Sequence, residues 1–207
     1  YVSGIKLETS APTAKGIFNA INTTYKFLTN KELSGSTIAI SGIGKVGSKL
    51  SRLLFEKKAD LIVSNIGRDP IDRLKHDKIS FTESDINLIF EQECDIISPC
   101  ALGRAINSET KKKLKCKAIV GAANNQLDNQ ETALWLKENN IFYAPDYLVN
   151  SGGVIAISCE INNSEDTLED QLNKISDKVL LLLKESKKSS LSTDKIVEDL
   201  AWKRINT

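Results

Sequence analysis

Three glycines at the start of a predicted helix give this chain its clearest chemical signature. The turn consists of Gly42, Ile43, Gly44, Lys45, Val46 and Gly47. Gly-x-Gly-x-x-Gly after a β-branched run is typical of a dinucleotide-binding turn. The glycines allow a tight strand-to-helix turn, close approach of backbone to a pyrophosphate, and close packing of the helix on the strand. The first N–H groups of the helix then face the phosphates.

The elements that position this turn continue along the chain as short β-branched runs alternating with amphipathic helices. This pattern predicts an α/β fold with a doubly wound, Rossmann-type sheet and right-handed crossovers. We expect strands at residues 38–41, 61–65, 95–98, 118–122 and 141–143. We expect helices from Pro12 and Thr13 onward and at residues 46–57, 83–92, 108–114 and 130–139, the last burying Ala133, Leu134 and Leu136.

The final third of the sequence carries helix signals and no strand signal. Helices are expected at residues 168–187 and 194–205, the second with Thr193 as its N-cap. We therefore predict a dinucleotide-binding domain at residues 1–160. Residues 161–207 would form a C-terminal helical extension that packs on this domain or on a second lobe.

Composition narrows the function classes. With 207 residues, 41% apolar residues and a formal charge of +1, the chain offers no electrostatic case for nucleic-acid binding. No apolar run reaches membrane-spanning length and no signal peptide is visible, so we expect no membrane partner and a cytoplasmic location. The chain contains no methionine, even at its start. This predicts a processed product or a fragment of a longer polypeptide.

The thiols and the single histidine argue against metal or triad chemistry. Four cysteines are scattered without a C-x-x-C spacing, and His76 lies in a polar stretch typical of a surface. We therefore predict reduced, mostly buried thiols and no metal site, with Cys100 as a packing residue.

Several segments resemble one family. They are residues 10–16 (SAPTAKG), the glycine turn, 94–103 (CDIISPCALG), 121–127 (GAANNQL) and 143–155 (YAPDYLVNSGGVI). In this order and at comparable spacing they resemble the cofactor-binding half of the amino acid dehydrogenases acting on leucine, phenylalanine, valine and glutamate. The likeness is closest to the leucine dehydrogenases, and it covers nearly the whole chain.

The resemblance implies NAD-dependent oxidative deamination of an apolar L-α-amino acid, such as leucine, to its 2-oxo acid and ammonia. It implies that Asn150 bonds the substrate, that Ala101 lies beside the nicotinamide ribose, and that Thr13 lies near the nicotinamide amide. Asn150 could instead cap the turn at Gly152. Asn124 ends a predicted strand at its carboxyl side, where open α/β sheets bind ligands, and is a further cofactor candidate.

Two features depart from the family pattern. NAD-binding folds place an Asp or Glu at the end of the second strand, where this chain has Asn65, and Arg68 three residues later leaves NADP open as an alternative. The family's lysine-bearing catalytic lobe would precede Tyr1. We therefore expect a homo-oligomeric full-length enzyme whose isolated cofactor half is inactive. The alternative is a catalytically silent dinucleotide-binding or regulatory module.

Overall fold

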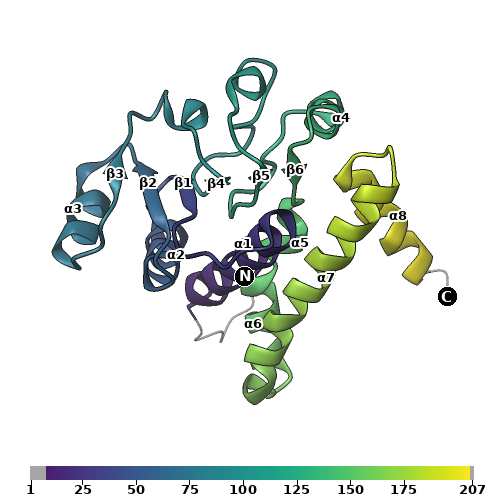
Figure 1. Ribbon diagram of the computed structural model, residues 1–207. Helices are drawn as coiled ribbons and strands as arrows, with labels where there is room; N and C mark the ends of the chain where they lie inside the picture. The colour runs from purple at the N-terminus through teal and green to yellow at the C-terminus, as the bar shows by residue number, and fades with distance from the viewer. Residues whose placement is uncertain (1–7, 206–207) are drawn as a thin grey trace.

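The computed structural model describes residues 8–205, which form a six-stranded parallel sheet flanked by helices (Figure 1). The strands are β1 (Thr37–Ser41), β2 (Asp60–Ser64), β3 (Thr82–Glu83), β4 (Ile96–Pro99), β5 (Ala118–Ile119) and β6 (Phe142–Tyr143). Their spatial order is β3-β2-β1-β4-β5-β6. This is the order of a doubly wound dinucleotide-binding sheet, so the predicted fold class is confirmed.

The sheet changes its direction of winding at β1. The chain moves outward from β1 through β2 and β3, and then returns to place β4 on the other side of β1. The register pairs Ile38 with Leu61 on one side and with Ile96 on the other. The connections that leave β1 and β4 at their carboxyl ends therefore diverge, and such a divergence opens a crevice where these sheets bind ligands.

Two layers of helix and loop cover the sheet. The helices are α1 (Ser10–Thr29), α2 (Lys45–Glu56), α3 (Arg68–His76), α4 (Gln130–Glu138), α5 (Asp146–Val149), α6 (Gly152–Ile161), α7 (Leu168–Lys188) and α8 (Thr193–Ile205). Three short 3₁₀ segments are η1 (Ile89–Glu91), η2 (Thr110–Lys113) and η3 (Glu165–Thr167). Because strand side chains alternate, Ile38 and Ile40 join the core under α1 and α2, whereas Ala39 joins the core under η1 and α4.

Helices α6 and α7 pack against α1, as Figure 1 shows for α7, whereas α8 packs against α7 and α4. Asn19 in α1 donates from Nδ2 to the carbonyl of Leu172 in α7 at 3.2 Å. A side chain on Gly16 would meet Ile175 Cδ1 at 2.8 Å, so α1 and α7 approach closely at that point. From residue 162 to residue 205 the chain forms η3, α7 and α8, joined by short turns, and no strand. No helix within residues 8–205 is long and apolar enough to cross a membrane. The division at residue 160 stays a prediction.

Two predicted helices are wrong, and local side-chain bonds explain both. Residues 83–92 form the end of β3, a turn and η1, because Asp85 Oδ1 accepts from the backbone N–H of Asn87 at 2.7 Å. Residues 108–114 form only η2, because Asn107 Oδ1 accepts from the N–H groups of Glu109 and Thr110. Asp and Asn side chains bonded in this way stabilise turns in competition with a helix.

Three smaller differences concern one helix that was not predicted, the exposure of one side chain and the start of the last helix. Helix α3 was not predicted, although Pro70 lies in its first turn, where the missing N–H group has no helical partner to lose. Leu134 is exposed rather than buried, because the buried face of α4 consists of Thr132, Ala133 and Leu136. Thr193 is the first residue of α8 and not its cap.

Candidate functional site

Each glycine of the turn has its own physical reason to lack a side chain. Gly42 has a φ of +101°, and an added Cβ would lie 2.6 Å from Ala101 Cβ. An added Cβ on Gly47 would lie 2.0 Å from the carbonyl oxygen of Gly42. A Cβ on Gly44 would meet nothing within 4 Å. Gly42 and Gly47 are therefore fixed by the fold, whereas the backbone at Gly44 faces open space that a ligand can approach.

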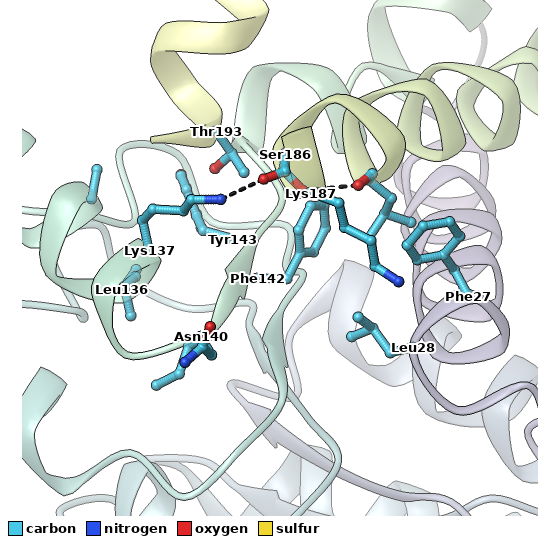
Figure 2. A pocket seen from close by; sticks show the side chains of 13 residues that line it. Phe27, Leu28, Leu136, Lys137, Asn140, Phe142, Tyr143, Ser186, Lys187 and Thr193 are labelled. Carbon is cyan, nitrogen blue, oxygen red and sulfur yellow. Dashed lines mark hydrogen bonds between the residues drawn. The ribbon is translucent and has the colours of Figure 1, made fainter. Parts of the chain in front are cut away.

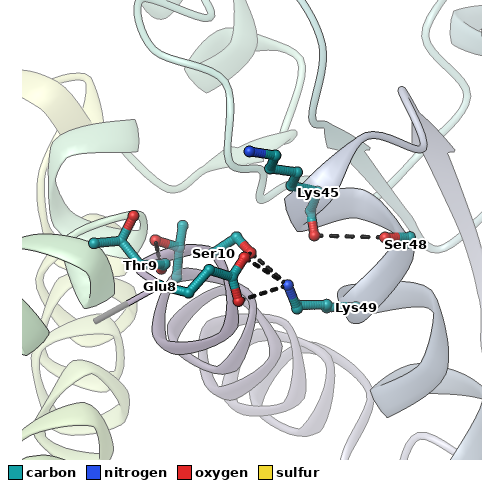
Figure 3. Close-up of polar contacts among 7 residues, drawn as sticks. Glu8, Thr9, Ser10, Lys45, Ser48 and Lys49 are labelled. Carbon is teal, nitrogen blue, oxygen red and sulfur yellow. Dashed lines mark hydrogen bonds and ion pairs between the residues drawn. The ribbon is translucent and has the colours of Figure 1, made fainter. Parts of the chain in front are cut away.

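The amino terminus of α2 lies directly at this turn. Gly44 is its N-cap and supplies no side-chain bond, so the first N–H groups and the positive end of the helix dipole are available to an anion. Figure 3 shows Lys49 held by Glu8 and Ser10, with Nζ 2.7 Å from Glu8 Oε1 and 2.6 Å from Ser10 Oγ. Lys49 accordingly lowers the pKa of Glu8. Lys45, at the first position of α2, forms no ion pair with any residue in the described range 8–205.

A groove of about 340 Å³ opens beside the turn at the carboxyl ends of β1, β2 and β4. Its walls include Gly42, Asn65, Ala101 and the apolar side chains of Ile66, Ile86 and Leu102. Ile66 is 81% exposed and Leu102 is 74% exposed. Exposed apolar groups on both sides of a groove fit a flat, weakly polar ring. Sequence reasoning missed Ile66, Ile86 and Leu102, although apolar residues in polar loops after strand ends are a usable signal.

Asn65 braces the glycine turn from the end of β2. Its Oδ1 accepts from the N–H of Ile43 at 2.9 Å, and its Nδ2 donates to the carbonyl of Gly67 at 2.9 Å. Arg68, the alternative contact for a phosphate, pairs with Glu83 and lies 3.7 Å from Asp72 Oδ1. Both side chains that bear on cofactor choice are thus already bonded within the chain.

The structure brings two predicted site residues together. Asn150 Nδ2 donates to Asn124 Oδ1 at 2.7 Å and to the carbonyl of Ala122 at 3.3 Å. Because a backbone carbonyl only accepts, these bonds fix which end of the Asn150 amide is nitrogen. Oδ1 of Asn150 is left without a partner in the described part of the chain. Ser151, not Asn150, is the N-cap of α6.

Hydrogen bonds made by Gln126 and Asp146 hold the loop that carries Asn124. Gln126 is fully buried and donates from Nε2 to the carbonyls of Gly121 at 2.8 Å and Ala123 at 3.0 Å. Asp146 Oδ2 accepts from the N–H of Asn125 at 3.0 Å, and Asp146 Oδ1 accepts from Tyr143 Oη at 3.1 Å. Asp146 therefore fixes the geometry of this loop. Gln126 was missed because nothing in its sequence context distinguishes it from a surface amide.

Thr13 lies where α1 meets the start of α6. Its hydroxyl donates to the carbonyl of Thr9 at 2.9 Å, and an added Cβ on Gly153 would lie 2.8 Å from Thr13 Oγ1. An added Cβ on Gly152 would lie 2.2 Å from the carbonyl oxygen of Pro12. This close packing of glycine on α1 places Thr13 beside the segment that follows Asn150.

All four thiols are free, and the pKa of three of them is raised. Burial raises the pKa of Cys100, and it raises the pKa of Cys94 and of Cys116 to about 12. An added Cβ on Gly47 would lie 3.5 Å from Cys100 Cβ, so Cys100 packs against the back of the glycine turn. No group of three or more His, Cys, Asp or Glu side chains within residues 8–205 is arranged to hold a metal ion.

Comparison with known proteins places this architecture among amino acid dehydrogenases. A family model described as Glutamate/Leucine/Phenylalanine/Valine dehydrogenase matches residues 61–193. Phenylalanine dehydrogenase of Thermoactinomyces intermedius is 37% identical over an alignment of 207 positions that covers 98% of this chain and 56% of that protein. Leucine dehydrogenase of Geobacillus stearothermophilus is 34% identical over an alignment of 216 positions, gaps included, that covers 100% of this chain and 58% of that protein. The chain thus spans a little over half the length of these curated relatives.

Solved structures agree with the sequence relatives. The crystal structure of L-tryptophan dehydrogenase from Nostoc punctiforme superposes with a TM-score of 0.92 at 31% identity, covering 97% of this chain and 62% of that chain. Hetero-hexameric glutamate dehydrogenase from Thermus thermophilus superposes with a TM-score of 0.72 at 16% identity, covering 92% and 50% of the two chains. At that identity the second likeness concerns the fold alone.

Proposed function

Because the chain belongs to the glutamate/leucine/phenylalanine/valine dehydrogenase family, we propose that it is the NAD-binding part of an L-amino acid dehydrogenase. The proposed reaction is oxidative deamination of an apolar L-α-amino acid, such as leucine, to its 2-oxo acid and ammonia. The observation that carries this proposal is the position of the Gly42–Gly47 turn, at the winding reversal between β1 and β4, with open space at Gly44.

The residues of the turn fit a dinucleotide. The N–H groups at Gly44, Lys45 and Val46 would hold the pyrophosphate at the start of α2, and the Lys45 ammonium group adds a free positive charge there. Ile66 and Ile86 would enclose the adenine ring, with Asn65 and Ile43 beneath its ribose. Ala101, Asn124 and Thr13 would lie toward the nicotinamide end. When bound, NAD accepts the hydride from the substrate Cα.

Asn150 would orient the amino acid. Its Nδ2 is committed to Asn124 and Ala122, so its free Oδ1 faces outward as an acceptor. An acceptor that is fixed in direction suits the N–H groups of a substrate amine, because the bond then holds the Cα hydrogen in one direction. In this role Asn124 is a positioning residue that acts through Asn150.

The ion pairs around Arg68 favour NAD over NADP. A 2′-phosphate on the adenosine ribose would approach the end of β2, where Glu83 and Asp72 already pair with Arg68. Lys75 Nζ also lies 3.6 Å from Glu83 Oε2, so two carboxylates balance two cations and leave no net positive charge for a phosphate. NAD carries no 2′-phosphate and needs no such charge.

The isolated chain would bind the dinucleotide without turnover. Lys15 pairs with Glu169 at 3.0 Å and Lys49 pairs with Glu8, so neither is a free base beside the site. The relatives are nearly twice as long, and we propose that a further lobe supplies the lysine that handles the substrate proton. We also propose a homo-oligomeric full-length protein. The glutamate dehydrogenase from Thermus thermophilus, which shares this fold, is hetero-hexameric.

One observation favours a second candidate function. Asn65 uses both ends of its amide within the chain and carries no charge, which weakens the ribose contact expected of an NAD enzyme. A catalytically silent dinucleotide-binding module would tolerate this loss. Such a module would bind NAD and stay inactive even as the full-length protein.

The test combines binding and turnover. Calorimetry on this chain is expected to give NAD binding that is tighter than NADP binding, with no leucine-dependent NADH formation. The full-length protein is expected to oxidise an apolar amino acid, and Asn150→Leu is expected to raise its KM for that amino acid about tenfold. Binding of NAD by a full-length protein that turns over none of leucine, phenylalanine or valine would favour the silent module, and failure to bind either cofactor would refute both.

A further inference from the structure

A second cavity lies at the outer edge of the sheet, away from the glycine turn. It has a volume of about 300 Å³ and lies beside β6, where α1, α4, α7 and the start of α8 come together (Figure 2). It shares no lining residue with the groove at Gly42 and Asn65. Nothing in the proposed dehydrogenase chemistry uses it.

The inner wall of this edge cavity is apolar. Leu28 of α1, Leu136 of α4, Phe142 of β6 and Leu183 of α7 line it. Leu136 and Leu183 are almost fully buried, whereas Leu28 is 36% exposed at the rim. Binding of a hydrocarbon group against this wall is favourable, because the contact removes apolar surface of both partners from water.

Two lysines face the cavity without a carboxylate partner. Lys137 donates from Nζ to the carbonyl of Ser186 near the end of α7, and Lys187 Nζ lies 4.4 Å from the centroid of the Phe27 ring. Neither lysine forms an ion pair within the described residues, and the lining contains no Asp or Glu. Figure 2 shows the Lys137 ammonium group directed toward Ser186 and the Lys187 ammonium group beside Phe27 and Leu28, at two different parts of the lining. The cavity therefore carries an unbalanced positive charge.

Unpaired hydrogen-bond donors accompany this charge. Thr193 is only 7% exposed and lines the cavity, yet its hydroxyl has no partner among residues 8–205. It begins the 13-residue helix α8, whose first N–H groups lack helical partners. The N–H groups of Phe142 and Ala144 bond to β5, so the N–H of Tyr143 between them faces the outer edge. Asp194, the next residue of α8, lines a different groove with Tyr147.

We propose that the edge cavity binds a small monocarboxylate with a branched or aromatic hydrocarbon body. The carboxylate accepts from Lys137, Thr193 and the start of α8, and the hydrocarbon body lies on Phe142 and Leu183. A volume near 300 Å³ lies at the lower end of small-molecule sites, which restricts the ligand to this size. One lysine is already shared with the Ser186 carbonyl, so the site suits one negative charge better than the two of a phosphate.

Amide NMR spectra of the 207-residue chain test this proposal. Titration with 4-methylpentanoate is expected to give saturable shifts at Tyr143, Thr193 and Lys187. The neutral isostere 4-methylpentanamide is expected to bind about tenfold more weakly. Absence of saturable shifts up to about 20 mM, equal affinity for acid and amide, tighter binding of inorganic phosphate, or shifts confined to the Gly42–Gly47 turn would each overturn it.

Three variants separate the site from general stability. Lys137→Gln and Thr193→Val are expected to weaken 4-methylpentanoate binding about tenfold and fivefold, with unchanged spectra elsewhere. Lys184→Gln, on the exposed side of α7, is the matched control and is expected to bind as the parent chain does. If Lys137→Gln disturbs the end of α7, Lys187→Gln removes the second charge and leaves the Ser186 contact in place. Unchanged affinity in Lys187→Gln and Thr193→Val would refute the site. The proposal is independent of NAD binding.

Discussion

Asn150 donates a hydrogen bond from Nδ2 to Oδ1 of Asn124 at 2.7 Å, although 26 residues separate them in sequence. The bond joins the loop after β5 to the segment before α6. Together with the Ala122 carbonyl, it determines which atom of the Asn150 amide faces outward. The chain thus presents an acceptor rather than a donor at the place where the family resemblance expects a substrate amine.

Replacing Asn150 by aspartate tests this orientation. Asn150→Asp places a carboxylate against two acceptors, Asn124 Oδ1 and the Ala122 carbonyl, and removes the donor that satisfied both. We expect the variant to lose about 1 kcal/mol of unfolding free energy at pH 7, measured by urea titration. The loss should shrink at pH 4, because a protonated carboxyl can donate again. Asn163→Asp, in an exposed loop, is the control, and equal stability of both variants would contradict the bond.

A pair of glycine substitutions separates fold from binding. Gly47→Ala forces a Cβ to within 2.0 Å of the Gly42 carbonyl oxygen, and we expect a loss of about 2 kcal/mol or more of stability. Gly44→Ala meets no atom within 4 Å, so its thermal midpoint should match that of the parent chain. Its NAD affinity should nevertheless fall about tenfold, because the new methyl group occupies the approach to the pyrophosphate. Calorimetry showing full NAD affinity for Gly44→Ala would place the pyrophosphate elsewhere.

Removing the charge of Glu83 should shift cofactor choice. Glu83 pairs with Arg68 and lies near Lys75, so Glu83→Gln releases the guanidinium and removes one negative charge. We expect the ratio of NADP to NAD affinity to rise about fivefold to tenfold. Asp60→Asn, an exposed change at the opposite end of β2, is the control for a general charge effect. A ratio that stays constant in Glu83→Gln would show that Arg68 does not face the ribose.

The partly buried thiols of Cys94 and Cys116 should make the fold sensitive to alkaline pH. The pKa of Cys94 and of Cys116 is raised from 9.0 to about 12 by burial, so the folded state disfavours their thiolates. Well below pH 9 both thiols are protonated in the folded and the unfolded chain, and as the pH rises through 9 the unfolded chain loses these two protons first. We therefore expect the thermal midpoint to fall as pH rises from 9 toward 12, and less so in the Cys94→Ala, Cys116→Ala double variant.

Alkylation gives an independent measurement on the same groups. Iodoacetamide reacts with thiolates, so Cys94 and Cys116 should react far more slowly in the folded chain at pH 8.5 than in urea. Site-resolved mass spectrometry distinguishes them from the other thiols. Equal rates in the folded and unfolded chains would contradict the burial that raises their pKa.

Local patterns in the sequence determined the strands, the glycine turn and the long helices. The β-branched and apolar side chains of Ile38, Ile40 and Leu61 predict β1 and β2 without any knowledge of their tertiary contacts. The spacing of Gly42, Gly44 and Gly47 likewise specifies a turn by backbone geometry alone. Residues 83–92 were misread because a periodic apolar pattern does not reveal that Asp85 bonds to the backbone of Asn87.

Only the tertiary structure decided what the polar side chains do. Asn65 follows β2 as a ribose ligand would, yet the fold brings the Ile43 N–H group to its Oδ1 and makes it a brace for the turn. Arg68 is committed to Glu83, and Asn150 to Asn124, by contacts across strands and loops distant in sequence. Strand and turn formation depend on neighbours along the chain, which the sequence contains. Hydrogen-bond partners depend on which segments lie next to one another in the folded chain, and the packing of helices on the sheet determines this.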